Sequence, residues 1–147
     1  MANPDVVVMV DEAYIDFGGA SALSLLDKYD NLLVIQTFSK SRAMAGMRIG
    51  FAVGNEKLIS YLNDVKFSFN SYTMNQTSIA MGVACVKDDE YFKTIVDKVI
   101  TTRERVKGEL RELGFSFPDS MSNFVFAKHS MIGGKELTSA LKEKGIA

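Results

Sequence analysis

The sequence predicts an α/β fold in which a long helix separates two unequal parts. Up to residue 87, short apolar runs bounded by turn residues alternate with amphipathic stretches, which is typical of a buried α/β sheet. A long helical pattern follows over 91–113, and a further strand and helix come after it. We therefore expect a partial large domain over 1–87, a linking helix over 88–113, and the start of a small α/β domain over 114–147.

Three strands are expected in the first part. The run Val6–Val10 is short, β-branched and uninterrupted, which suits a strand buried on both faces. Asp30-Asn31 is a turn signal, and the apolar run Leu32–Thr37 after it is expected to form the second strand. The segment Arg48–Val53 alternates enough to be the third, and Gly54 closes it.

Helices are expected after the third strand. Asn55 is a good N-cap for a helix over 56–65, whose apolar residues fall on one side. Asp88-Asp89-Glu90 places negative charge at the start of the long helix, which favours its N-terminus. Arg103 interrupts the apolar stripe along that helix. The remaining expected elements are a helical turn over 24–29, helices over 76–86 and 135–144, and a strand over 123–128.

Composition excludes several classes of protein. The 147 residues include 17 Lys and Arg against 18 Asp and Glu, so no basic excess attracts nucleic acid or an anionic membrane surface. Cys85 is the single cysteine, which leaves no disulfide within the chain and fits a cytoplasmic protein. No apolar stretch reaches the roughly 20 residues that span a bilayer, and the start does not resemble a signal peptide. We expect no nucleic-acid or membrane partner and, with His129 the only histidine, no metal site.

Chemically reactive residues follow the first two strands. Asp11 and Tyr14 come directly after the first strand, and Lys40 follows the second. Ser39 precedes the lysine, and Arg48 lies eight positions beyond it. Such strand ends are where ligands bind in open α/β sheets. An amine that can condense with an aldehyde, beside a hydroxyl and a guanidinium that can hold a phosphate, predicts a site for a phosphorylated aldehyde.

The motifs around these residues resemble the fold-type I aminotransferases, which use pyridoxal phosphate. Residues 37–46, Thr-Phe-Ser-Lys-Ser-Arg-Ala-Met-Ala-Gly, are similar to the class-II aminotransferase signature. Residues 11–17, Asp-Glu-Ala-Tyr-Ile-Asp-Phe, and residues 67–73, Phe-Ser-Phe-Asn-Ser-Tyr-Thr, resemble the histidinol-phosphate aminotransferase branch. The resemblance covers essentially the whole chain but only the middle and later part of that family's longer sequence. It implies the later part of the large-domain sheet and the start of the small domain.

The resemblance also implies a role for each site residue. Lys40 would bind the cofactor aldehyde covalently and, once freed by substrate, would carry the proton between the substrate carbon and the cofactor. Asp11 would pair with the pyridine nitrogen and keep it protonated, and Tyr14 would hydrogen-bond the ring 3-oxygen. The cofactor phosphate would be held by Ser39 and Arg48, together with Thr37.

The activity implied by the resemblance is reversible amino transfer between small molecules. L-Histidinol phosphate and 2-oxoglutarate would give imidazole-acetol phosphate and glutamate, in histidine biosynthesis, and the parent enzyme would be a cytoplasmic homodimer. The family's ring-stacking aromatic residue, Gly-rich turn and substrate-binding arginine have no counterpart in the chain. We therefore expect a fragment that is inactive or nearly so by itself.

Three alternatives stay open at this stage. A threonine-phosphate decarboxylase-like enzyme would share Asp11, Tyr14, Lys40 and Arg48. An aminotransferase-like effector domain of a transcription regulator would bind the cofactor without turnover. A folded remnant would bind nothing and would self-associate through exposed sheet edges.

Overall fold

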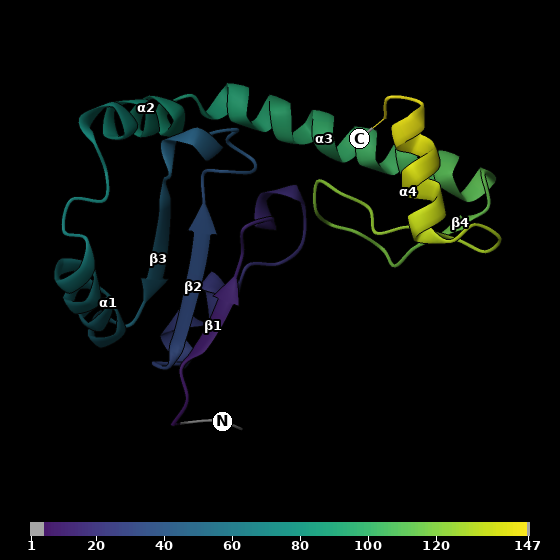
Figure 1. Ribbon diagram of the computed structural model, residues 1–147. Helices are drawn as coiled ribbons and strands as arrows, with labels where there is room; N and C mark the ends of the chain where they lie inside the picture. Colours follow the sequence, from purple (N-terminus) through teal and green to yellow (C-terminus); the bar gives the residue numbers. More distant parts are fainter. Residues whose placement is uncertain (1–4, 147) are drawn as a thin grey trace.

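A computed structural model describes residues 5–146 and contains a three-stranded sheet in the order β1-β2-β3 (Figure 1). Strand β2 runs parallel to β1, with Asp11 opposite Ile35, and antiparallel to β3, with Thr37 opposite Gly50. The ends of β1 and β2 and the start of β3 therefore lie along one edge, which we call the carboxyl edge. The bounds are Val8–Asp11 for β1, Leu32–Thr37 for β2 and Gly50–Gly54 for β3.

The strand predictions are confirmed for β2 and need correction for its neighbours. The second strand has the predicted bounds, and its Val34 side chain is fully buried. Strand β3 begins two residues later than expected because Arg48 has a left-handed backbone (φ 56°) that breaks the extended run. The prediction that the first strand is buried on both faces is wrong: β1 lies at the edge of the three-stranded sheet, and its Met9 side chain is 58% exposed.

Two helices follow the sheet and lead into a third, long one. Asn55 caps α1 (Glu56–Phe69) as predicted, its side chain accepting from the Lys57 amide at 2.9 Å. Helix α2 (Gln76–Lys87) lies against the carboxyl edge, where the buried Ser78 hydroxyl donates to the Met47 carbonyl at 2.9 Å. Short 3₁₀ helices connect the strands, namely η1 (Ile15–Phe17), η2 (Ala22–Lys28), which takes the place of the predicted helical turn, and η3 (Ala45–Met47).

Helix α3 (Asp89–Glu112) passes above the sheet and reaches the second part of the molecule (Figure 1). Asp88 caps it, accepting from the Tyr91 amide at 3.3 Å, so the predicted acidic start is confirmed. Gly114 (φ +84°) turns the chain after the helix. There β4 (Phe115–Ser116) pairs antiparallel with β5 (Lys128–His129), and α4 (Gly134–Glu143) follows. Within residues 5–146, no helix is long and apolar enough to cross a membrane.

The predicted strand over 123–128 is wrong, because only its last residue is in β5. Side-chain hydroxyls shape the preceding turn instead. The Ser120 hydroxyl donates to the Phe124 carbonyl at 2.6 Å, and the Phe124 amide donates to the Ser122 hydroxyl at 3.3 Å. Such local bonds offer the backbone an alternative to strand pairing. The three-part domain division stays a prediction, and residues 1–4 and 147 of its outer parts lie outside the described residues.

Two helical glycines allow a test of this packing. Gly108 in α3 has open space where a Cβ would lie, so Gly108→Ala is expected to raise the free energy of unfolding by about 0.5–1 kcal/mol. A Cβ on Gly82 in α2 would lie 2.9 Å from Ile49 Cδ1, so Gly82→Ala should gain less or lose stability. Urea denaturation of both variants checks this. Equal gains would contradict the close packing of α2 on the carboxyl edge.

Candidate active site

Strand β1 ends at Asp11, on the carboxyl edge. The Asp11 carboxylate accepts from the Ala13 amide at 3.0 Å, a local bond that turns the chain away from the strand. The side chain is exposed, and a carboxylate has lone pairs for further donors. The structure therefore presents a carboxylate at the position where the sequence predicts a cofactor contact.

The neighbouring Glu12 is buried and anchors this turn. It accepts from the Ala22 amide at 2.6 Å, the Ser21 hydroxyl at 2.7 Å and the Gln36 side chain at 2.9 Å. Burial by itself would raise the pKa of Glu12, but these three hydrogen bonds together hold that pKa below its ordinary value of 4.5. Glu12 was not singled out from the sequence, although a carboxylate directly after an apolar strand was a visible signal.

Removing the Glu12 charge is expected to loosen the end of β1. Glu12→Gln leaves amide donors facing the new NH₂ group, and we expect a loss of roughly 1–3 kcal/mol in unfolding free energy. Because the folded pKa is lowered, the carboxylate stabilises the fold above pH 4.5, and this contribution is lost as the pH falls through the folded value. When denaturation is measured at pH values from 7 to 3, the free energy of unfolding should change less with pH in Glu12→Gln than in the unsubstituted chain. An unchanged pH slope would contradict this assignment.

Tyr14 and Lys40 lie together at the centre of the carboxyl edge. The Lys40 amine lies 5.3 Å from the centroid of the Tyr14 ring, within cation–π range. Phe124 also packs edge-on against that ring, with centroids 5.3 Å apart. The lysine is exposed, but the next residue, Ser41, is buried and its hydroxyl donates to the Asp16 carboxylate. The lysine loop is thus fastened to the segment that carries Tyr14.

Arg42 holds the same loop against helices α2 and α3. Its guanidinium lies 4.0 Å from the Phe92 ring of α3 and donates to the Cys85 carbonyl of α2 at 3.2 Å. These three residues line a cavity of about 290 Å³ behind the loop. Both residues after Lys40 are therefore held by contacts, which restricts the backbone that carries the amine.

Two of the three residues predicted to bind phosphate, Thr37 and Ser39, contact each other beside the start of β3, and the third, Arg48, precedes that strand. Thr37 Oγ1 lies 3.0 Å from the Ser39 hydroxyl, accepts from the Ser39 amide at 3.1 Å, and lies 3.2 Å from the Ile49 carbonyl. Arg48, next to Ile49, is exposed and uses one Nη1 bond on the Ala45 carbonyl at 3.0 Å. Its other guanidinium donors are suited to phosphate oxygens.

Comparison with known proteins shows the family to which the chain belongs. The sequence profile of the family described as "Aminotransferase class I and II" matches residues 1–147, and the chain belongs to that family. The chain is 57% identical over 145 residues to the histidinol-phosphate aminotransferase of Brachyspira hyodysenteriae, covering 98% of this chain and 41% of the relative. Other relatives of the same enzyme name are 50–52% identical. The chain thus spans about two fifths of the length of the curated relatives it matches.

Solved structures agree with this family. The histidinol-phosphate aminotransferase of Clostridium acetobutylicum superposes with a TM-score of 0.86 at 27% identity, covering 96% of this chain and 43% of that one. The Sinorhizobium meliloti enzyme, solved in complex with pyridoxal-5'-phosphate, gives a TM-score of 0.78 at 23% identity, covering 95% of this chain and 39% of that one. The predicted α/β fold of these aminotransferases is confirmed, over part of their length.

Proposed function

We propose that the chain forms part of the active site of a histidinol-phosphate aminotransferase, which transfers an amino group between L-histidinol phosphate and 2-oxoglutarate. The observation that carries the proposal is the contact of Lys40 with Tyr14 on the sheet edge that also holds Asp11 and Arg48. The names of the relatives at 50–57% identity favour this enzyme over the decarboxylase-like and effector-domain alternatives.

The donor set fits pyridoxal phosphate group by group. The Lys40 amine suits its aldehyde, the Asp11 carboxylate its ring nitrogen, and the Tyr14 hydroxyl its 3-oxygen. When bound, this cofactor supplies a ring that withdraws electrons from the reacting carbon of the substrate. The phosphate would be held by the two neighbouring hydroxyls and the guanidinium of Thr37, Ser39 and Arg48.

The protein's own contribution is binding, orientation and proton transfer. Lys40 would bind the aldehyde, and its released amine would then carry a proton to and from the substrate carbon. Asp11 would hold a proton on the ring nitrogen by its negative charge. The contacts of Ser41 and Arg42 restrict the backbone that carries the lysine, which favours one direction for the amine and supports fast transfer.

The complete active site would need further residues from outside this chain. The curated relatives are much longer than the chain, and the resemblance places a ring-stacking aromatic residue and a substrate-binding arginine beyond it. We therefore propose that the chain alone is inactive or nearly so, and that the whole enzyme is a cytoplasmic homodimer acting on a small-molecule amino donor and keto acceptor.

Absorbance with added pyridoxal phosphate tests the proposed site. The unsubstituted chain should develop an absorbance band near the short-wavelength limit of the visible range, and Lys40→Ala should lack it. Lys57→Ala, an exposed lysine in the first turn of α1, is the matched control and should keep the band. Absence of a band in the unsubstituted chain, or its persistence in Lys40→Ala, would count against the proposal.

A further inference from the structure

We propose that Arg103 is a positioning residue that clamps two loops together and so keeps Phe124 against Tyr14 and Tyr14 beside Lys40. The Tyr14 loop, residues 14–19, follows β1, and the Phe124 loop, residues 119–124, lies between β4 and β5. The inference rests on the proposed function, because that function assigns Tyr14 and Lys40 to the cofactor.

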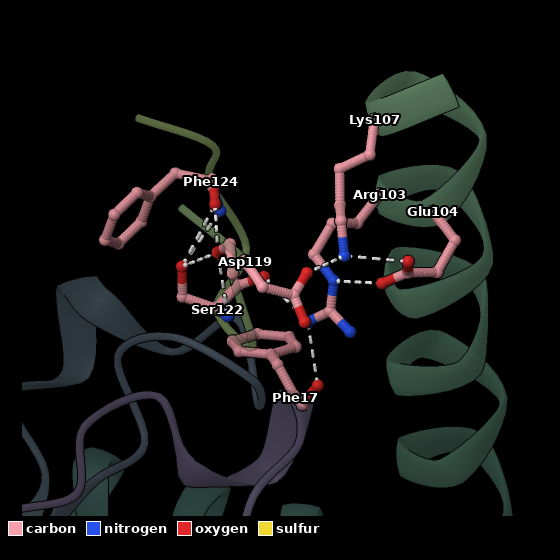
Figure 2. Close-up of polar contacts among 8 residues, drawn as sticks. Phe17, Arg103, Glu104, Lys107, Asp119, Ser122 and Phe124 are labelled. Carbon is pink, nitrogen blue, oxygen red and sulfur yellow. Dashed lines mark hydrogen bonds and ion pairs between the residues drawn. The ribbon is translucent and has the colours of Figure 1, made fainter. Parts of the chain in front are cut away.

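The guanidinium of Arg103 reaches from α3 to both loops. Its Nη1 atom donates to the Phe17 carbonyl at 2.9 Å and to the Ser122 carbonyl at 3.0 Å, as Figure 2 shows. The side chain is only 9% exposed, and hydrogen bonds from a charged donor are stronger than neutral ones. One nitrogen therefore joins two segments that are far apart in the sequence.

Neighbouring charges hold the clamp in place on α3. Arg103 Nε lies 2.9 Å from a Glu104 oxygen, whose partner oxygen accepts from the buried Lys107 amine at 2.8 Å. The same amine pairs with Asp119, the first residue of the Phe124 loop (Figure 2). Two cations thus face two carboxylates, which offsets the cost of burying the charges.

The two loops also touch directly. Gly18 has φ +143°, a backbone conformation that favours glycine, and a Cβ there would lie 3.3 Å from the Met121 Cβ, which is a tight contact. Beyond that contact, the Phe124 ring meets the Tyr14 ring edge-on at an interplanar angle of 84°. The Tyr14 ring is the surface over which the Lys40 amine lies.

Side-chain hydroxyls within the Phe124 loop link Phe124 to the residue that Arg103 holds. The hydroxyls of Ser120 and Ser122 lie 2.6 and 3.1 Å from the Phe124 carbonyl, and 3.0 Å from each other. Holding the Ser122 carbonyl therefore holds Phe124. Contacts run without a gap from Arg103 through Phe124 and Tyr14 to the lysine.

Hydrogen exchange of the 147-residue chain tests the clamp without cofactor. Arg103→Ala should speed amide exchange in both loops roughly tenfold or more, while the β2 and β3 amides stay protected. Arg105→Ala is the matched control, because this arginine lies on the same helix, is exposed and pairs only with Glu109 among the described residues. Gly18→Ala should speed exchange in the same two loops, because a side chain at φ +143° strains the peptide whose Phe17 carbonyl accepts from Arg103 and presses on Met121. Faster exchange throughout the chain, or in one loop only, would overturn the proposal.

A pH titration of the cofactor band then tests positioning against a purely structural role. Arg103→Ala and Tyr14→Phe should each shift the pH midpoint of the band, and the double variant should shift it no further than Tyr14→Phe does. Additive shifts would show that the arginine does not act through Tyr14 and would overturn the proposal. If the unsubstituted chain shows no band, the proposed function fails, and the exchange result alone decides whether Arg103 clamps the loops.

Discussion

Lys40→Ala is expected to abolish transamination in an enzyme built around this segment. The test uses a grafted enzyme, in which this chain replaces the matching segment of the Brachyspira hyodysenteriae relative, 57% identical over 145 residues. Without the amine there is no covalent partner for the aldehyde and no group to carry the proton. Acid–base catalysis alone contributes about 10²–10⁴-fold, so kcat should fall by on the order of 10³-fold or more.

The control for this prediction is a lysine of the same segment that lies away from the carboxyl edge. Lys57→Ala removes an exposed amine at the start of α1 and should leave kcat within about twofold of the grafted enzyme. Circular dichroism should show both variants folded. A Lys40→Ala enzyme that keeps most of its activity would exclude this lysine as the catalytic group.

Asp11→Asn is expected to have the second largest effect. Asparagine keeps the size of the side chain and an oxygen to accept from the Ala13 amide, but it removes the negative charge. A charge placed where the reaction needs it contributes about 10²–10³-fold, so kcat of the grafted enzyme should fall by that factor. Steady-state kinetics with histidinol phosphate measure it.

A distant carboxylate serves as the comparison for Asp11. Asp64 is exposed on α1, and Asp64→Asn should leave kcat unchanged within about twofold. If the Asp11 and Asp64 variants behave alike, Asp11 does not contact the cofactor ring. If Asp11→Asn loses activity because the turn after β1 unfolds, the melting temperature will drop with it.

Much of the fold could be predicted because local signals agreed with the tertiary structure. The bounds of β2 were predicted correctly because it is the central strand, where an apolar run and burial coincide. The run at β1 is equally apolar, but burial depends on neighbours that the pattern does not contain, and β1 is an edge strand here. The strand predicted over 123–128 was wrong because serine hydroxyls form hydrogen bonds with the backbone locally. Strand propensity takes no account of such bonds.

The candidate site shows the same division between local and distant information. Motifs located Asp11, Tyr14, Lys40 and Arg48. These residues lie along one edge because β1 and β2 are parallel and β3, which Arg48 precedes, is antiparallel to β2. The supporting residues were missed because their partners are distant in the sequence. Arg103 showed only as a break in an apolar stripe, yet it bonds carbonyls 86 and 19 positions away.

Chemical trapping of the cofactor tests most directly whether Lys40 is the residue that binds it. The chain is incubated with pyridoxal phosphate, reduced with borohydride, digested, and mapped by mass spectrometry. We expect the added mass on the peptide containing Lys40, at an occupancy well above that of any other lysine, and none above background in Lys40→Ala. Label spread evenly over exposed lysines such as Lys57, with no preference for Lys40, would contradict this expectation.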